Sequence, residues 1–318
     1  MRTKAAIVTV LVLGLAVGGM TASAQEPAAS HEAWSKIVPP DAKVEKLAGG
    51  MKFTEGPVWS SADGGFLVFS DIPSNELKKW SKKGGLTTFR KPSHNTNGNT
   101  RDGEGRLISC EHGSRTVTRT GKDGKVETLA DRHDGKRLNS PNDAAVKSDG
   151  SIWFTDPPYG LEGRPAEQPG NFVYRLDPKT KDLKVVVNDM KWPNGICFSP
   201  DEKRLYVANS DGRNALINVF EVKEDGTLGS GREFCRIDKG VPDGIRCDAA
   251  GRVWSSAGDG VHAFSPEGKL LGKIRVPESP ANLCFGGDDG KTLFITARSS
   301  LYAVRTNVAG ATRAVAAP

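Results

Sequence analysis

Six oxygen-bearing side chains recur along the chain, each at the start of a similar short motif. The motifs begin at Glu55, Asn97, Asn142, Asn194, Asp243 and Asn282. The clearest copies run from proline to Asn or Asp and then into a short apolar stretch, as Pro193-Asn194-Gly195-Ile196 does. Carboxylate and amide oxygens are the ligands that hard divalent cations prefer in proteins. The recurring motif therefore predicts a cation site, with Ca²⁺ as the first choice and Mg²⁺, Mn²⁺ or Zn²⁺ as alternatives.

The expected ligand set for the cation consists of four of these residues: Glu55, Asn142, Asn194 and Asp243. Two carboxylates balance the charge of one dication, which makes burial of the set tolerable. Asn97 and Asn282 stand in weaker copies of the motif, and we expect Asn97 to bind substrate, with water as the alternative. Asn-Gly and Asp-Gly are ordinary turn dipeptides, so a turn is the alternative for any one position taken alone. Recurrence in register favours a shared site.

The spacing of the motifs indicates how the chain positions them. Successive motifs are separated by 42, 45, 52, 49 and 39 residues, and apolar segments of strand length follow each one. The chain has 37 glycines and 19 prolines, and helical periodicity is nearly absent. Repeats of this length with paired strands and Gly-rich turns are typical of β-propeller blades. We predict an all-β, six-bladed propeller with four-stranded blades, in which each motif begins an innermost strand and all six converge on the axis.

The segment from Lys43 to Leu47 alternates like a strand but has no blade of its own. A propeller closes into a ring, because an unpaired sheet edge invites aggregation. We therefore predict that this segment pairs into the last blade, beside residues 293–296 and 301–304. A single propeller domain then spans residues 43–318.

The first residues have the pattern of a secretory signal. Arg2 and Lys4 precede an apolar stretch, and Ala22-Ser23-Ala24 matches a cleavage site, which predicts a signal peptide over residues 1–24. A single membrane anchor is the alternative. We expect residues 25–42 to form a loose leader, and the mature protein to be periplasmic or secreted and free of the membrane.

The charge of the chain argues against nucleic acid as a partner. The formal net charge is +6, and Arg2 and Lys4 supply two of the positive charges. The other Lys and Arg residues are scattered over turns, which is typical of a solvated rim. The sequence contains no G-x-S-x-G elbow, phosphate loop or dinucleotide fingerprint. A small molecule at the axis is therefore the expected partner, and the oligomeric state is left open.

The five cysteines do not form a metal or redox motif, because their number is odd and no C-x-x-C is present. Cys197, Cys247 and Cys284 fall within predicted inner strands, where a thiol behaves as a small buried apolar group. A disulfide between Cys235 and Cys247 is the alternative in an exported protein.

Two further side chains are candidates for the site. The link after the second strand of blade three is long, covering residues 157–170, and lies on the face where the six motifs converge. We expect it to form a partial lid with Tyr159 as its substrate contact, the alternative being a surface insertion without a role. His112, at the end of a second strand, is the histidine that we place near the substrate, although a lone histidine is often structural.

The motifs together resemble the SMP-30/gluconolactonase/luciferin-regenerating family of six-bladed propellers. The resemblance covers about residues 43–304 and is carried by four segments in order: residues 53–59, 139–143, 192–195 and 242–244. It implies that one divalent metal is held by Glu55, Asn194 and Asp243, with Asn142 as a further ligand or a substrate contact, and that Asp243 is the catalytic base or proton donor. Some members have an arginine at the place of Ser140, so their arginine contact to substrate does not carry over.

The resemblance implies a metal-dependent lactonase that acts on a sugar lactone such as gluconolactone. Asp243 would take a proton from the attacking water, and metal-bound hydroxide is the alternative nucleophile, because a carboxylate on a dication is a weaker base. Two other functions stay open. One is hydrolysis of an organophosphate or another ester at the same metal site. The other is ligand binding without catalysis, with calcium in a structural role.

Overall fold

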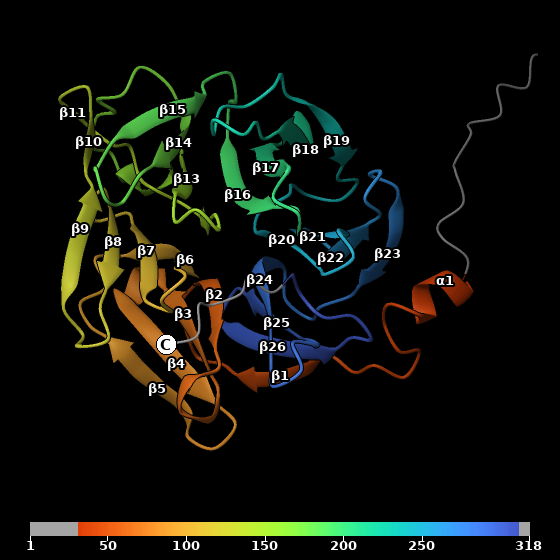
Figure 1. Cartoon of the computed structure of the whole chain (residues 1–318). Coiled ribbons are helices and arrows are strands. Elements are labelled where there is room, and N and C mark those ends of the chain that lie inside the picture. The colour runs from red at the N-terminus through yellow and green to blue at the C-terminus, as the bar shows by residue number, and fades with distance from the viewer. Residues whose placement is uncertain (1–30, 312–318) are drawn as a thin grey trace, which may run out of the picture.

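The computed structural model describes residues 31–311, which form six four-stranded antiparallel sheets arranged in a ring (Figure 1). The all-β six-bladed propeller predicted from the repeat is confirmed. The predicted signal peptide and the first residues of the predicted leader lie outside the described residues.

The first five blades each run outward in chain order from the axis. Blade one comprises β2 (Thr54–Ser60), β3 (Phe66–Asp71), β4 (Glu76–Ser81) and β5 (Gly85–Arg90). Blade two comprises β6 (Thr96–Arg101), β7 (Leu107–Glu111), β8 (Thr116–Thr120) and β9 (Val126–Ala130). Blade three comprises β12 (Ala144–Val146), β13 (Ile152–Asp156), β14 (Phe172–Leu176) and β15 (Leu183–Val187).

Blades four and five follow the same plan. Blade four comprises β16 (Pro193–Phe198), β17 (Arg204–Asp211), β18 (Asn214–Glu221) and β19 (Arg232–Arg236). Blade five comprises β20 (Ile245–Cys247), β21 (Val253–Ala257), β22 (Gly260–Phe264) and β23 (Leu270–Ile274). Outside the blades lie a small hairpin and three short helical turns: β10 (Arg132–His133), β11 (Lys136–Arg137), η1 (Ala62–Gly64), η2 (Ile72–Ser74) and η3 (Tyr159–Leu161).

The last blade joins the two ends of the described chain. It is built from β24 (Pro280–Gly286), β25 (Thr292–Ala297), β26 (Ser300–Arg305) and β1 (Glu45–Ala48). Strand β1 pairs antiparallel with β26, with Lys46 opposite Tyr302. The predicted closure of the ring by an N-terminal strand is therefore confirmed, and β1 covers the edge that β26 would otherwise expose.

Large apolar side chains between neighbouring blades hold the ring together. Trp153 of blade three meets Phe198 of blade four edge-on, with 5.4 Å between ring centroids. Trp254 of blade five meets Phe285 of blade six in the same way at 5.5 Å. Both tryptophans are fully buried, and such edge-on pairs stabilise by about 0.5–1.5 kcal/mol beyond the burial of their area. Apolar side chains of one blade thus pack against those of the next blade.

Residues 31–42 do not form the loose leader that we expected. They begin with a short helix, α1 (His31–Ser35), and continue along the outer edge of blade five. Trp34 lies 6.3 Å from Trp254 between ring centroids, and Ile37 and Val38 are buried. The expectation was wrong because these apolar residues cover the outer edge of the sheet. No helix among the described residues is long and apolar enough to cross a membrane.

All five cysteines are buried thiols. The alternative of a disulfide between Cys235 and Cys247 is wrong, since the neighbour of the Cys247 sulfur is Cys197, with 3.7 Å between the two Sγ atoms. The thiols fill space in the core as expected.

Candidate active site

A glycine follows the leading side chain in four of the six motifs, at Gly56, Gly98, Gly195 and Gly244. The backbone N–H of Gly98 donates to the carbonyl of Asn142 at 2.7 Å, and that of Gly195 donates to the carbonyl of Asp243 at 3.1 Å. A Cβ atom at Gly195 would lie 2.1 Å from that carbonyl oxygen. Glycine is required here because neighbouring blades touch backbone to backbone at the axis. The alternative of an ordinary turn dipeptide is therefore wrong for these two positions.

Irregular pairing at the start of the inner strands turns the leading side chains toward the axis. The register shifts between Glu55 and Val58, between Thr96 and Asn99, and between Pro193 and Ile196. A bulge of this kind re-aims a side chain out of the regular alternation. Asn142 and Asp243 stand two residues before β12 and β20, slightly earlier than the predicted strand starts.

The converging amides form a hydrogen-bonded chain across three blades. Asn97 Nδ2 donates to Asn142 Oδ1 at 2.6 Å, and Asn142 Nδ2 donates to Asn194 Oδ1 at 2.5 Å. Asn194 Nδ2 donates to Ser210 Oγ at 2.9 Å. On the other side of the axis, Asn282 Nδ2 donates to Glu55 Oε2 at 2.9 Å. The leading side chains of five motifs therefore lie in two hydrogen-bonded groups at the inner strands.

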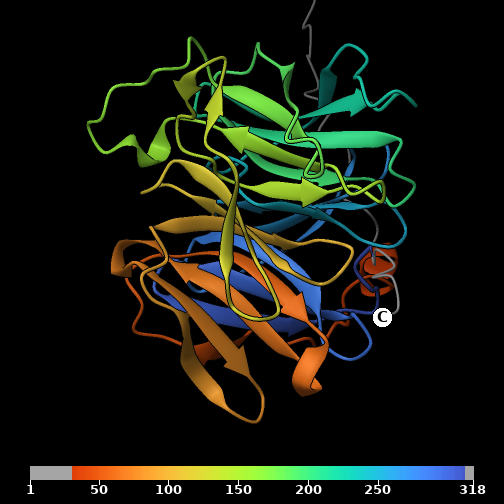
Figure 2. The ribbon, with the colours of Figure 1, turned by 60° about the vertical axis from the view of Figure 1, so that its left-hand side comes forward.

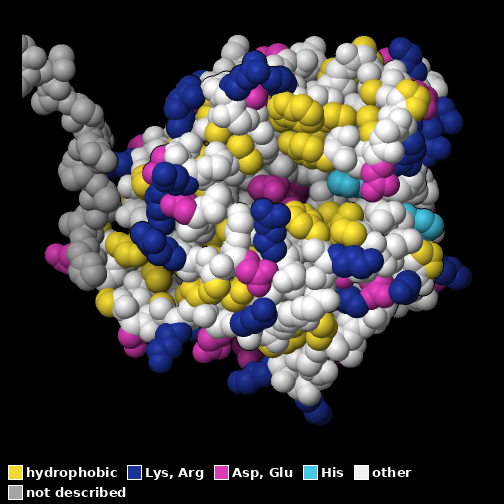
Figure 3. Space-filling model, turned by 180° about the vertical axis from the view of Figure 1, so that it is seen from behind, with side chains coloured by type: hydrophobic (Ala, Val, Ile, Leu, Met, Phe, Trp, Pro, Cys, Tyr) yellow, Lys and Arg dark blue, Asp and Glu magenta, His cyan; other side chains and the backbone are white. Residues whose placement is uncertain are grey.

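Glu55 and Asp243 are two acids that disfavour each other's ionisation. Burial, followed by the charges of Asp243 and Asp143, raises the pKa of Glu55 well above its usual range. Burial and the charge of Asp143 raise the pKa of Asp243 to about 7, against a hydrogen bond from Asn194 that lowers it. Figure 3 shows acidic side chains in a recess near the centre of one face, between hydrophobic side chains.

The donor set suits a hard dication. It consists of two carboxylates that repel each other and amide oxygens that keep a second lone pair after accepting one hydrogen bond. A dication between the acids would remove the repulsion that raises their pKa values. The residues Glu55, Asn142, Asn194 and Asp243 therefore fit an oxygen-ligated cation such as Ca²⁺.

His112 lies beside this chain of amides. Its Nε2 is 3.3 Å from Asn97 Nδ2, and burial lowers its pKa to about 4, against a hydrogen bond with Asn142 that raises it and with a smaller lowering by the charge of Arg164. The imidazole is therefore neutral at physiological pH. Its predicted place near the other candidate residues agrees with the structure.

The long link of blade three lies over the same face, and Figure 2 shows it projecting at the left. Tyr159 stacks on Trp192, with 5.4 Å between ring centroids. Burial raises the pKa of Tyr159 to about 12, against hydrogen bonds with Ser210 and Asn194 that lower it. Tyr159 is 41 % exposed as a whole residue, so it extends from the surface to the amide chain.

Several residues of the site were missed by the sequence analysis. Trp192 stacks on Tyr159. Ser210 accepts a hydrogen bond from Asn194 and donates one from Oγ to the carbonyl of Pro242 at 2.5 Å. Beneath the site, Arg246 Nη1 of blade five donates to Asp143 Oδ2 of blade three at 3.0 Å. Arg246 also lines a cavity of about 630 Å³ at the other ends of the inner strands. Asp143 follows Asn142 of a recurring motif, so the sequence contained a signal for it. No feature of the sequence pointed to Arg246.

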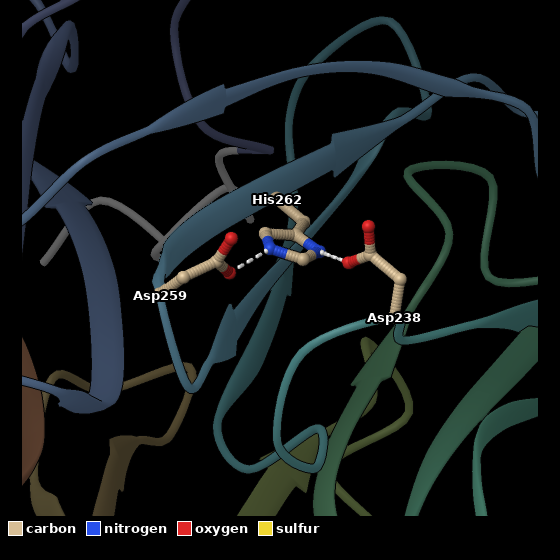
Figure 4. Close-up of side chains that lie close together, drawn as sticks. All are labelled: Asp238, Asp259 and His262. Carbon is tan, nitrogen blue, oxygen red and sulfur yellow. Dashed lines mark hydrogen bonds and ion pairs between the residues drawn. The ribbon is translucent and has the colours of Figure 1, made fainter.

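A second acidic cluster lies at the periphery, where His262 stands between Asp238 and Asp259 (Figure 4). His262 Nε2 is 2.6 Å from Asp259 Oδ1. Lys273 Nζ lies 2.7 Å and 2.8 Å from the two oxygens of Asp238 and 3.2 Å from Asp259. The ammonium group already supplies the positive charge, so these residues fit a surface ion-pair network better than a metal site.

Comparison with known proteins decides the family. The model of the SMP-30/gluconolactonase/LRE-like region matches residues 53–299. The chain belongs to this family. It is 35 % identical to a gluconolactonase of Zymomonas mobilis subsp. mobilis over 84 % of this chain and 82 % of the relative. It is 31 % identical to a 6-deoxy-6-sulfogluconolactonase of Pseudomonas putida over 76 % of this chain and 82 % of the relative.

Among solved structures, the chain is similar to a gluconolactonase from Xanthomonas campestris, with 37 % identity, a TM-score of 0.82 and coverage of 88 % of this chain and 94 % of that one. The resemblance of the sequence to the SMP-30/gluconolactonase family is thus confirmed. Within this SMP-30 family member, Ser140 holds the link of blade three. Its Oγ donates to the carbonyl of Pro157 at 2.6 Å and accepts from the N–H of Gly160 at 2.9 Å.

Proposed function

We propose that this protein hydrolyses a sugar lactone, of which gluconolactone is the model, at the axial site. The chain is a lactonase, a conclusion supported by relatives that are a gluconolactonase and a 6-deoxy-6-sulfogluconolactonase. The observation that carries the axial assignment is the pairing of Glu55 with Asp243, two acids with raised pKa values beside a chain of amides. Acid pairs with perturbed pKa values are concentrated at catalytic sites.

Four residues would hold a divalent cation, with calcium the first choice: Glu55, Asn142, Asn194 and Asp243. When bound, the cation supplies Lewis-acid polarisation of an ester carbonyl and charge stabilisation for an oxyanion. Asn97, His112, Asn142 and Tyr159 are the candidate substrate contacts. Asn97 and Asn142 supply amides, and Tyr159 supplies a hydroxyl beside Asn194.

Asp243 is the proposed proton carrier. The oxygen of water adds to the lactone carbonyl carbon while Asp243 accepts one proton from that water. The ring C–O bond then breaks, and Asp243 returns the proton to the departing ring oxygen, which gives the hydroxy acid. A side chain that carries a proton between the attacking water and the leaving group contributes about 10²–10⁴-fold to the rate.

A lactone assay with and without chelator tests the proposal. Purified protein is given D-glucono-δ-lactone, and acid release is followed before and after treatment with EDTA and after restoring Ca²⁺, Mg²⁺, Mn²⁺ or Zn²⁺. We expect turnover that falls at least tenfold with EDTA and returns with one of the cations. Turnover of a phosphotriester but of no lactone would contradict the proposal, and so would lactone turnover that EDTA leaves unchanged.

Export is a separate part of the proposal and is supported by the N-terminal pattern alone. Cleavage after Ala24 would release a chain that starts at Gln25 in the periplasm or outside the cell. Mass spectrometry of the protein from a periplasmic extract tests this. An intact N-terminus in the cytoplasmic fraction would contradict it.

A further inference from the structure

Two cysteine thiols meet between blades four and five, at the innermost strands of the ring. Cys197 lies in β16 and Cys247 ends β20, and their Sγ atoms are 3.7 Å apart. These two strands are neighbours in Figure 1, although the cysteines are 50 positions apart in the chain. A separation of 3.7 Å is van der Waals contact between two sulfur atoms, so the thiols touch directly.

The alternation of side chains along the inner strands explains why the two cysteines face each other. Within β16, Cys197 packs into the core that blade four shares with blade five, whereas Ile196 and Phe198 pack into the core shared with blade three. Within β20, Ile245 and Cys247 pack toward blade four. The two cysteines therefore lie on the facing sides of one contact between blades.

Both cysteines line the cavity of about 630 Å³ at the ends of the inner strands that lie away from the amide chain. Among the described residues that form its wall, they are the only cysteines. The wall also includes the exposed residues Gly103 and Ser148, so the cavity is open to solvent. Cys284 is as little exposed as Cys247, at 6 %, but does not line this cavity. The cavity therefore gives a small reagent a route to Cys197 and Cys247.

Thiol–disulfide exchange can convert this pair of thiols into a disulfide. The S–S bond is about 2.05 Å long, so the two sulfurs have to approach each other by about 1.6 Å. The thiolate of one cysteine attacks a small disulfide, R–S–S–R, and releases one R–S⁻. The thiolate of the other cysteine then attacks the mixed disulfide and releases the second R–S⁻. The protein loses two protons and two electrons, and the small disulfide is reduced to two thiols.

We propose that Cys197 and Cys247 form a redox site, in which a small disulfide oxidises the pair to a disulfide bond between blades four and five. The bond links the strands that lead from Asn194 and Asp243, because these residues stand three and four positions before the cysteines. Joining two positions 50 residues apart restricts the unfolded chain and thereby stabilises the fold. The redox site is separate from the proposed lactonase reaction and uses none of its residues.

Peptide mapping of the oxidised protein tests the proposal. Purified protein is treated with bis(2-hydroxyethyl) disulfide under native conditions, its remaining thiols are blocked with N-ethylmaleimide in urea, and it is digested with trypsin. We expect the peptides of residues 192–203 and 247–252 to be joined, because each contains one cysteine and is bounded by tryptic sites. The number of thiols should fall from five to three, and dithiothreitol should restore it.

The melting temperature provides a second readout. We expect oxidation to raise it by about 5–10 °C in the unaltered protein and to leave it unchanged in Cys197→Ser. Cys235→Ser is the matched control and should keep the rise. Cys235 is buried in the same core, but it lies on β19, which is three strand spacings, or about 14 Å, from β16 and therefore beyond the reach of a disulfide with Cys197.

Several results would overturn the proposal. All five thiols could survive the treatment, or one cysteine could retain the reagent as a stable mixed disulfide. A cross-link that forms only in urea, or that joins Cys110, Cys235 or Cys284, would count against it equally. If Cys197→Ser does not fold, the peptide map of the unaltered protein decides by itself, and loss of lactonase activity has no bearing on the result.

Discussion

At the scale of single residues, the site depends on acids that burial and mutual repulsion keep from ionising easily. Glu55 is 3 % exposed, and its carboxylate accepts hydrogen bonds from Asn282 Nδ2 and from the N–H of Gly56 at 2.6 Å. Asp243 has a hydrogen bond from Asn194. The two acids are therefore not equivalent, because Glu55 is held by more donors and Asp243 is freer to exchange a proton.

Asp243→Asn is the substitution that separates proton transfer from folding. Asparagine keeps the shape and one acceptor oxygen but cannot accept a proton from water at neutral pH. We expect kcat for D-glucono-δ-lactone to fall by a factor of about 10²–10⁴, the usual contribution of a general base. The melting temperature should stay the same or rise, since one repelling charge is removed. Turnover near the wild-type rate would reject the role of Asp243.

The buried acid Asp156 leads to a prediction of how the stability of the protein depends on pH. It is fully buried, its Oδ1 has no partner, and burial raises its pKa to about 7. Because the folded pKa lies above the unfolded one of about 3.9, the folded state binds the proton more tightly, and stability falls as pH rises from about 4 to 7. In Asp156→Asn the free energy of unfolding should fall less than in wild type between pH 5 and 7.5, the difference being on the order of 2–3 kcal/mol.

Urea unfolding at several pH values measures this difference. The exposed acid Asp123 supplies the control for the loss of a carboxylate as such, through Asp123→Asn. Parallel stability curves for wild type and Asp156→Asn would show that Asp156 is ionised throughout this range.

At the scale of elements, the link between β13 and β14 is a fixed wall and not a lid that closes. Arg164 joins it to blade two through the carbonyls of His112 and Gly113. Gln168 Nε2 joins it to the β10–β11 hairpin through the carbonyl of Lys136 at 2.9 Å. Glu167 Oε2 accepts from the N–H of Arg137 at 2.9 Å. The expectation of a partial lid was right about the place of the link but did not foresee these attachments.

Arg164→Ala should loosen the link between β13 and β14. The substitution removes the donors to two carbonyls of blade two, so we expect faster proteolytic cleavage within residues 157–170 and a higher KM for the lactone. Limited digestion with chymotrypsin, which can cut after Tyr159 and Leu161, followed by mass spectrometry locates the cuts. Arg236→Ala, which removes an exposed arginine of blade four, should leave the digestion pattern unchanged. Equal cleavage rates in Arg164→Ala and wild type would mean that Ser140 and Gln168 hold the link without Arg164.

At the scale of the whole molecule, the sequence was sufficient for the fold because a repeat places equivalent residues in equivalent positions. The six motifs predicted the blades, and the unpaired segment before them predicted the closing strand. The repeat could not predict pairs that break its symmetry. Asp143 and Arg246 lie 103 positions apart and occupy different places in their motifs, so nothing in the pattern links them. The packing of Trp34 on blade five was missed for the same reason.

The Arg246–Asp143 pair ties blade five to blade three directly beneath the site. Asp143 is 1 % exposed and the side chain of Arg246 is 18 % exposed. Burial would lower the pKa of Arg246, but the charge of Asp143 outweighs burial and raises it. Without Arg246, three acids would share the axis: Glu55, Asp143 and Asp243. Arg246 therefore neutralises the carboxylate of Asp143, an acid that is not among the expected cation ligands.

Arg246→Met should be costly because it leaves Asp143 buried without its partner. We expect a loss of about 3–5 kcal/mol in the free energy of unfolding, the usual effect of breaking a buried ion pair. Adding Asp143→Asn removes the unpaired charge and should recover most of that loss, since the amide oxygen can still accept from the N–H of Ala144. Arg305→Met, which breaks an exposed pair with Asp289, should cost no more than about 1 kcal/mol. Urea unfolding of these three variants, of the single variant Asp143→Asn and of wild type measures the coupling. If the double variant is no more stable than Arg246→Met alone, the arginine stabilises the ring through packing across the axis and not by neutralising Asp143.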